Sequence, residues 1–186
     1  MRVTVLAGGP SSEREVSLES GAAVADACVR LGRDVFKADV MPDDTTALDR
    51  PCDIVFPVLH GPFGEDGTLQ AMLEEQGLRY VGSDSAASRR CMDKHVSKQY
   101  WSDAGLPTAP WVVVSSSDAS TAEAVEPPVV VKPSGEGSSV GVVLADTMEE
   151  ARRAIEHSLT QFDRVLVEKR LIGRELTVGI LGDRVL

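Results

Sequence analysis

Residues 128–144 read PVVVKPSGEGSSVGVVL, and this stretch decides the fold of the second half of the chain. A β-branched run ends at Lys132, and a glycine- and serine-rich loop, 134–141, leads to a further strand at 142–144. A lysine that ends a buried strand needs an anionic partner, because an unpaired buried ammonium is costly. Glycines let the backbone approach phosphate oxygens closely, and serine hydroxyls and N–H groups donate hydrogen bonds to them. We interpret the loop as a phosphate-binding loop, with a flexible hairpin loop as the alternative.

Two common nucleotide-binding motifs do not describe this loop. A Walker A loop needs Gly-Lys followed by Ser or Thr, which residues 134–141 lack. A dinucleotide fingerprint needs another glycine spacing and a following helix, whereas Gly135, Gly137 and Gly141 lead into a strand. Upstream, five basic side chains gather within ten residues of an otherwise acidic chain: Arg89, Arg90, Lys94, His95 and Lys98. Because Lys94 and Lys98 are four residues apart, they share one helix face, and we assign them with the loop to a nucleotide site.

The second half of the chain has the pattern of an α+β domain. A helix is expected at about 147–157, and a Ser/Thr/Asp-rich insert before residue 128 is expected to be helical. Gly182-Asp183 fits a two-residue hairpin turn. The final Val185-Leu186 begins an apolar return strand, so we expect the domain to continue, with a short terminal edge strand as the alternative. The expected strands are 111–114, 128–131, 142–144, 165–168 and 175–181.

The first hundred residues alternate strand and helix signals, which indicates a mostly parallel sheet with crossover helices. The segment 105–108 (GLPT) is the expected boundary between two domains, 1–106 and 107–186. The expected elements before it are strands at 2–7, 53–59 and 80–81, and helices at about 17–31, 68–75 and 84–103.

Composition excludes several classes of protein. The chain has 29 acidic and 19 basic side chains and a net charge of -10, which repels nucleic acid and anionic membranes. Its 42% hydrophobic and 26% charged content is typical of a globular protein. The three cysteines form no CxxC motif and are expected to be small hydrophobic residues in a reducing compartment. No stretch has the pattern of a signal peptide or approaches the ~18 apolar residues of a membrane helix, so we expect a cytoplasmic protein.

The segment 8–17 (GGPSSEREVS) is the first candidate binding site. It follows a strand and begins a helix, which places free N–H groups and a positive dipole end at the carboxyl edge of the sheet. That environment suits a carboxylate or a phosphate, while Glu13 and Glu15 suit an ammonium group. A site with both features fits an amino acid. The alternative is a plain helix cap with acidic residues in its first turn.

A second candidate site, residues 60–67 (HGPFGEDG), also follows a strand. Three glycines beside a histidine and two acidic residues indicate an exposed loop near the same sheet edge. His60 is a catalytic candidate, although a lone histidine is more often structural.

Four motifs follow one another in this order along the chain: residues 8–17, residues 60–67, the pair Tyr80-x-Gly82-Ser83 and Met92-Asp93-Lys94, and residues 132–141. Together they resemble the D-alanine–D-alanine ligases, which are ATP-grasp enzymes. The resemblance implies a Rossmann-like parallel-sheet N-terminal domain (1–106), followed by an incomplete α+β ATP-grasp domain (107–186). Two positions depart from the family pattern: Gly135, where a basic residue is common, and Ala71, where glycine is common.

The resemblance also implies the catalytic and amino-acid-binding residues. Glu13 should hold the ammonium of the first D-alanine, and Val16 should lie beside its side chain. His60 should lie close to the same substrate. Ser138 should belong to a hydrogen-bonded trio with Glu13 and a residue of a later loop.

For the nucleotide, the resemblance implies that ATP phosphates are bound by Lys94 and Lys132 with Ser138 and Ser139. Adenine is expected at the hinge, and the ribose hydroxyls at a carboxylate. The hinge residues are Glu168, Lys169 and Leu171, and the carboxylate is Glu175. The family's magnesium ligands are expected beyond residue 186, so no metal ligand is assigned within this chain.

The activity implied is ATP-dependent ligation of two D-alanines through an acyl phosphate, for peptidoglycan precursor synthesis. The 186 residues alone are expected to be an inactive fragment. A non-catalytic module that binds the nucleotide and the amino acid, and a D-alanine–D-lactate ligase, are the alternatives. The family commonly forms homodimers through its N-terminal domain, and we expect no nucleic-acid or membrane partner.

Overall fold

A three-stranded parallel sheet forms the first half of the chain. The computed structural model describes residues 1–115 and 124–186. In the first sheet the strand order is β2-β1-β3, and both neighbours run parallel to the central strand. The strands are β1 (Arg2–Leu6), β2 (Asp34–Ala38) and β3 (Ile54–Pro57). Parallel strands need crossover connections. A long helix connects β1 to β2, and a segment that contains the short 3-10 helix η1 (Thr46–Asp49) connects β2 to β3.

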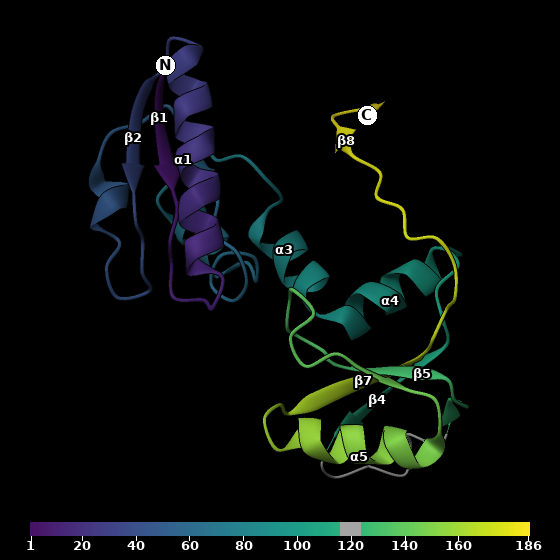
Figure 1. Cartoon of the computed structure of the whole chain (residues 1–186). Coiled ribbons are helices and arrows are strands. Elements are labelled where there is room, and N and C mark those ends of the chain that lie inside the picture. The colour runs from purple at the N-terminus through teal and green to yellow at the C-terminus, as the bar shows by residue number, and fades with distance from the viewer. Residues whose placement is uncertain (116–123) are drawn as a thin grey trace.

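Helices cover both faces of the parallel sheet, so its strands are apolar on both sides. On one face, Val3 and Val5 of β1 pack with Ala25 of α1 (Arg14–Arg30). On the other, Leu6 and Val55 belong to a cluster with two leucines of α2 (Thr68–Glu75), Leu69 and Leu73. Figure 1 shows α1 lying along this sheet, with its N-terminal end at the carboxyl edge of the strands.

An antiparallel sheet of order β4-β7-β5-β6 forms the second half. Helix α5 (Met148–Leu159) covers one face and buries a core of valines and alanines. A capping box formed by Thr147 and Glu150 begins α5. The strands are β4 (Trp111–Ser115), β5 (Val129–Pro133), β6 (Val143–Ala145) and β7 (Arg164–Lys169). The two sheets confirm the expected combination of a parallel-sheet half and an α+β half.

Two helices connect the halves, where the sequence pattern predicted one. The predicted helix 84–103 is broken at Asp93 into α3 (Ser85–Met92) and α4 (Lys94–Asp103). The Asp93 backbone is extended, and its carboxylate accepts the N–H groups of His95 and Val96, so it ends one helix and caps the next. Helix α4 lies over the face of the antiparallel sheet opposite α5 (Figure 1).

Several other predictions need correction. Strand β2 was not expected, and α1 begins three residues before the predicted start. The predicted strand 80–81 is a single parallel bridge between Val55 and Tyr80. The predicted strand 175–181 is reduced to β8 (Ile180–Leu181), which pairs with β9 (Arg184–Val185) and confirms the hairpin turn at Gly182-Asp183. The predicted helical insert between β4 and β5 lies largely outside the described residues, at 116–123.

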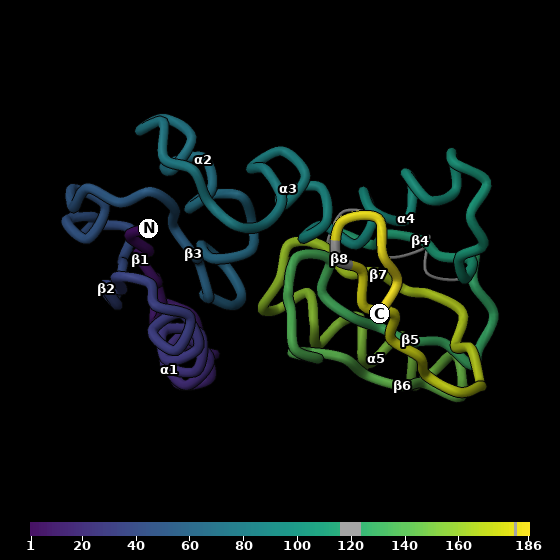
Figure 2. Tube along the Cα trace, turned by 90° about the horizontal axis from the view of Figure 1, so that it is seen from above, coloured from purple at the N-terminus to yellow at the C-terminus, as the bar shows by residue number. Residues whose placement is uncertain are grey.

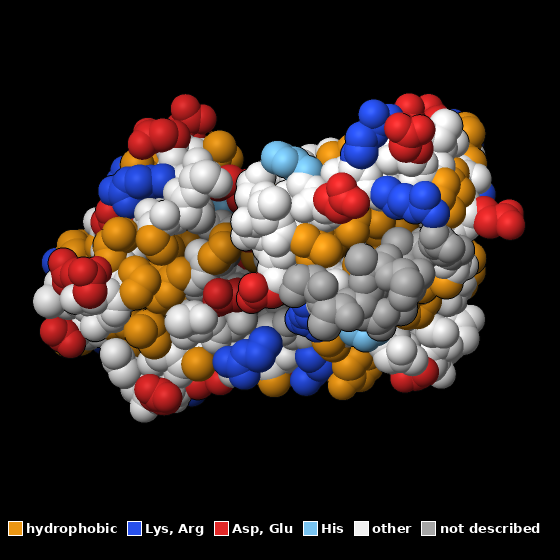
Figure 3. Space-filling view, turned by 90° about the horizontal axis from the view of Figure 1, so that it is seen from below, with side chains coloured by type: hydrophobic (Ala, Val, Ile, Leu, Met, Phe, Trp, Pro, Cys, Tyr) orange, Lys and Arg blue, Asp and Glu red, His pale blue; other side chains and the backbone are white. Residues whose placement is uncertain are grey.

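The two halves stand side by side as two lobes. On the face of the two lobes drawn in Figure 3, acidic and basic side chains are interspersed, with apolar side chains between them. In the parts of the chain that the structure describes, no helix combines the length and apolar character needed to cross a membrane.

The chain after β7 leaves the antiparallel sheet. Figures 1 and 2 show it running past α4 to the small hairpin β8-β9. Its apolar side chains are exposed, with Ile172 at 89% and Leu176 at 78%. Within residues 1–115 and 124–186, no backbone hydrogen bond is found for the amides of 171–178.

We expect this difference in hydrogen bonding to appear in amide hydrogen exchange. Amides of 171–178 should exchange close to the rate of an unstructured chain, because they lack partners and buried contacts. Amides of β5 and β7, at the centre of the sheet, should exchange several orders of magnitude more slowly. Equal protection of the two segments, measured by NMR or mass spectrometry, would contradict this description of the tail.

Candidate functional site

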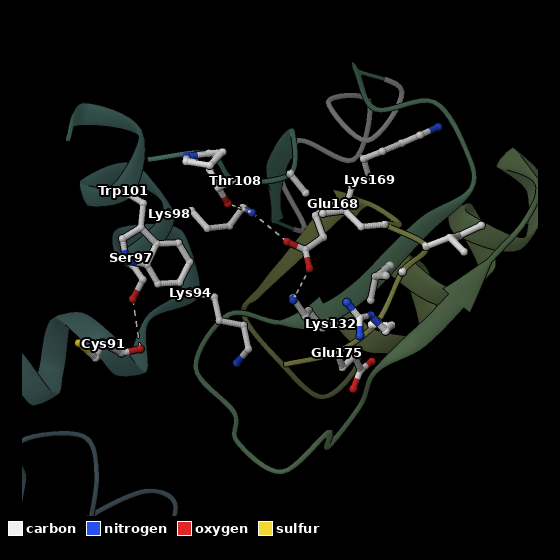
Figure 4. A pocket seen from close by; sticks show the side chains of 17 residues that line it. Cys91, Lys94, Ser97, Lys98, Trp101, Thr108, Lys132, Glu168, Lys169 and Glu175 are labelled. Atoms are coloured by element: carbon white, nitrogen blue, oxygen red, sulfur yellow. Dashed lines mark hydrogen bonds and ion pairs between the residues drawn. The ribbon is translucent and has the colours of Figure 1, made fainter. Parts of the chain in front are cut away.

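A cavity of about 850 Å³ lies between α4, the antiparallel sheet and residues 171–175 (Figure 4). Six of the eight residues expected to bind nucleotide line it, and the two serines of the loop do not. These six are Lys94, Lys132, Glu168, Lys169, Leu171 and Glu175. The cavity also includes Lys98, which shares its helix face with Lys94, and residues that the sequence reasoning did not assign to a site, among them Trp101 and Thr108.

Strand alternation explains why Lys132 and Glu168 face this cavity. In β5, residues Val129, Val131 and Pro133 are buried, whereas Val130 and Lys132 are only half-buried and face the other side of the sheet. Strands β5 and β7 pair with Val130 opposite Glu168, so Lys132 is the diagonal neighbour of Glu168 on the same face. The face turned away from α5 therefore carries the charged side chains.

Glu168 is the centre of the charged cluster. One carboxylate oxygen accepts a hydrogen bond from Lys132, and the other lies 2.9 Å from the Lys98 ammonium (Figure 4). Burial opposes ionisation of Glu168, but the hydrogen bonds from Lys132 and Lys98 outweigh it and hold the pKa of Glu168 below its usual value. The carboxylate therefore stays charged at neutral pH.

Lys94 joins the start of α4 to the glycine- and serine-rich loop 134–141. Its backbone N–H donates to the Ser134 carbonyl at 2.9 Å, and its ammonium donates to the Glu136 carbonyl. Burial, followed by the nearby positive charge of Lys132, lowers the pKa of Lys94. Two ammonium groups that repel each other in this way would both be relieved by an anion bound between them.

The Lys169 ammonium does not point into the cavity as those of Lys94 and Lys132 do. The Lys169 ammonium donates to the carbonyls of Glu126 and Pro127 at 2.9 and 3.0 Å, and it points away from Glu168 (Figure 4). Leu171 is 74% exposed. Lys169 therefore holds the chain before β5 in place, and it leaves only its backbone and aliphatic stem for the cavity.

The expected amino-acid site brings two distant motifs together. Ser138 Oγ donates to Glu13 Oε1 at 2.6 Å, across 125 residues of chain. Both Ser138 and Ser139 have positive φ, which turns the loop toward α1. A Cβ added to Gly61 would lie 3.4 Å from Glu13 Oε2, so the 60–67 loop lies at the same place. The loop 134–141 of the second lobe thus contacts the carboxyl edge of the parallel sheet in the first lobe.

The two remaining expected residues flank this contact. His60 Nδ1 lies 3.7 Å from Glu65 Oε1, and His60 Nε2 is buried without a hydrogen-bond partner among the described residues. Val16 lies in the first turn of α1, just after Glu13, and is 54% exposed. Val16 is three residues after Glu13, and His60 directly precedes Gly61, whose position lies beside Glu13 Oε2.

Comparisons with known proteins agree with this geometry. The N-terminal domain of the D-Ala–D-Ala ligase family matches residues 32–83, and its C-terminal domain matches residues 100–186. The chain belongs to the D-alanine–D-alanine ligase family. It is 45% identical to the D-alanine–D-alanine ligase of Geobacter sulfurreducens over 98% of this chain and 59% of that protein. The chain spans about three fifths of the length of the curated relatives that it matches.

Solved structures of ligases share the fold. The D-alanyl-alanine synthetase A of Vibrio cholerae superimposes with a TM-score of 0.87 at 27% identity, covering 100% of this chain and 64% of that one. The VanG D-Ala:D-Ser ligase of Enterococcus faecalis gives a TM-score of 0.80 at 27% identity, covering 92% of this chain and 63% of that one.

Asp93 belongs to the motif Met92-Asp93-Lys94, but the sequence reasoning gave it no role in the site. Besides capping α4, its carboxylate accepts hydrogen bonds from Ser134 Oγ at 2.9 Å and from Arg164 at 2.6 Å. Burial opposes its ionisation, but the hydrogen bonds from Ser134, Val96 and Arg164 hold the pKa of Asp93 below its usual value. An Asp directly before a helical run is a sequence signal for an N-cap, and it could have located this break.

We expect Asp93→Ala to lower the free energy of unfolding by about 2 kcal/mol, since it removes a helix cap and a charge-assisted hydrogen bond. Asp93→Asn keeps the cap and should cost about half as much. Urea unfolding followed by circular dichroism measures both changes, with Asp26→Asn, an exposed carboxylate on α1, as the matched control.

The cost of Asp93→Asn should depend on pH with a defined sign. Because the folded-state pKa of Asp93 is lowered, its charge stabilises the fold at pH above the unfolded value of about 3.9. That stabilisation is lost as pH falls through the lowered folded pKa, so the wild type and Asp93→Asn should converge in acid. A difference that stays constant from pH 7 to pH 3 would contradict the assignment.

Proposed function

We propose that these residues form the nucleotide-binding and first-amino-acid-binding parts of an ATP-dependent D-alanine–D-alanine ligase that acts in peptidoglycan precursor synthesis. The observation that carries the proposal is the 2.6 Å hydrogen bond from Ser138 to Glu13. It joins a glycine- and serine-rich loop suited to phosphate to a carboxylate suited to an amino acid's ammonium. The names of the relatives support the same reaction.

The proposed chemistry needs a phosphate and an amino acid side by side. A bare carboxylate is a poor acceptor for an amine, so ATP first phosphorylates the carboxylate of one D-alanine. The amine of the second D-alanine then attacks the acyl phosphate and releases inorganic phosphate. In this arrangement Glu13 holds the first ammonium, with Val16 and His60 beside that substrate. Positive groups aimed at the transferred phosphoryl group stabilise the charge that develops.

We assign the cavity to ATP. Its volume of about 850 Å³ lies within the usual range for small-molecule sites. Lys94 and Lys132, with Ser138 and Ser139, are assigned to the phosphates, because two mutually repelling ammonium groups and a donor-rich loop favour an anion. The adenine end is assigned to Glu168, Lys169 and Leu171, and the ribose hydroxyls to Glu175.

Magnesium is the second cofactor of the proposed reaction. Among residues 1–115 and 124–186, no three His, Cys, Asp or Glu side chains are grouped closely enough to hold a metal ion. We therefore assign no magnesium ligand among these residues and no step of the reaction to the ion. We expect the ligands in the part of the relatives' length that this chain does not span.

Three further aspects of the function are proposals. We expect a cytoplasmic protein that forms homodimers through residues 1–106, which sedimentation would test. The second substrate is proposed to be D-alanine. The VanG neighbour is named for D-Ala:D-Ser ligation, so the shared fold does not by itself distinguish D-alanine from another second substrate such as D-lactate.

We expect Lys132→Ala to weaken ATP binding by about tenfold to a hundredfold, because it removes a charge-assisted contact to phosphate. The measurement is an NMR titration of the 186-residue chain with ATP, following amides of the cavity. Lys37→Ala, an exposed lysine on β2, is the matched control and should leave the affinity unchanged. Equal affinities of wild type and Lys132→Ala would remove Lys132 from the phosphate site.

We expect the 186-residue chain to release little or no phosphate from ATP with Mg²⁺ and D-alanine, because we assign the magnesium ligands to the part of the relatives' length that this chain does not span. A coupled phosphate assay measures this. Rapid Mg²⁺-dependent release would contradict the assignment of the metal ligands to another segment. Tight binding of ATP or D-alanine without turnover would favour the alternative of a non-catalytic binding module.

A further inference from the structure

We propose that Lys98 is a positioning residue of the nucleotide pocket. Its buried ammonium pairs with one carboxylate oxygen of Glu168. Because Glu168 is shared in this way, it does not fully neutralise Lys132, which can then bind a phosphate. Lys98 shares the helix face of Lys94, but no contact with the nucleotide has been assigned to it. The inference rests on the proposed binding of ATP in this cavity.

Lys98 is almost completely enclosed by partners from three elements. Its side chain is 6% exposed, and its ammonium lies 2.9 Å from Glu168 Oε2 on β7. It also donates to Thr108 Oγ1 at 2.6 Å, in the segment before β4. Its third neighbour is the ring of Trp111 on β4, with the ammonium 5.0 Å from the ring centroid. A buried ammonium with so many partners is held in one place.

Glu168 divides its two oxygens between two lysines of different exposure. Oε2 faces Lys98, whereas Oε1 accepts from Lys132, whose side chain is 22% exposed. Both lysines line the cavity, but Lys132 has more surface free to meet a ligand. Lys98 is therefore placed to hold the carboxylate, and Lys132 to reach the nucleotide.

The charges of these three groups explain why the second lysine matters. Two ammonium groups and one carboxylate leave one net positive charge beside Lys94. Without Lys98, the single negative charge of Glu168 would neutralise Lys132 alone, and Glu168 could turn both oxygens toward it. A phosphate would then have to compete with Glu168 for Lys132. Lys98 thus affects phosphate binding without touching the phosphate.

The test compares ATP binding by the 186-residue chain and by variants at position 98, using NMR titration. Lys98→Met removes the charge at similar length and should weaken ATP binding about tenfold. Lys98→Arg restores the charge and should bind within about threefold of the wild type. Lys37→Met, on the exposed side of β2, is the matched control and should change nothing.

The indole N–H signal of Trp111 reports whether the groups around Lys98 have moved. The chain has two tryptophans, so two indole N–H signals are expected, and a Trp101→Phe variant assigns them. Trp111 Nε1 donates to His95 Nδ1 at 3.1 Å and lies against Lys98, so its signal should shift in Lys98→Met and return in Lys98→Arg. If Lys98→Met does not fold, Thr108→Val removes one partner of Lys98 and should weaken ATP binding twofold to threefold.

A double variant separates positioning from an independent role. If Lys98 acts through Glu168 and Lys132, then Lys98→Met should add less than twofold to the loss caused by Lys132→Ala. Full additivity, failure of Lys98→Arg to restore binding, or unchanged affinity in Lys98→Met would each overturn the inference while leaving ATP binding intact. No shift of cavity amides when ATP is added to the wild type would instead overturn the proposed function.

Discussion

The carboxylate of Glu168 ties helix α4 to the antiparallel sheet, and the pocket takes its shape from that connection. It lies half-buried on the face opposite α5, where an unpaired charge would be unfavourable. Lys98 from α4 and Lys132 from β5 supply the two opposite charges. Because one partner is on the helix and the other on the sheet, the same interaction that stabilises the carboxylate also holds the two walls of the cavity at a fixed distance.

A second carboxylate, Asp93, holds the other end of α4. It caps the helix, accepts Ser134 from the start of the loop, and pairs with Arg164 at the start of β7. The adjacent Lys94 donates to the loop through both its backbone and its ammonium. The glycine- and serine-rich loop 134–141 is thus fixed at its first residues by the helix N-terminus. A loop held in this way keeps its donors aimed in one direction without a bound ligand.

The two lobes contribute different chemistry to one place. The parallel sheet presents the carboxyl edge of its strands and the start of α1, where Glu13 is found. The antiparallel sheet presents a loop whose Ser138 reaches that carboxylate. Neither lobe contains both Glu13 and Ser138, so this hydrogen bond depends on how the two lobes are aligned. The connecting helices α3 and α4 therefore help to set the geometry of the site.

Local patterns in the sequence determined much of this protein. The spacing of apolar residues predicted α2 at 68–75, and the turn residues predicted the hairpin turn at Gly182-Asp183. Both features depend on near neighbours in the chain. They also identified Lys132 as a charge that needs an anionic partner, and they placed Lys94 in a basic cluster on one helix face. Only the tertiary structure decided that Asp93 pairs with Arg164, and that Lys98 and Lys132 share Glu168. These contacts join groups between 36 and 71 residues apart in the chain, and no local pattern records such distances.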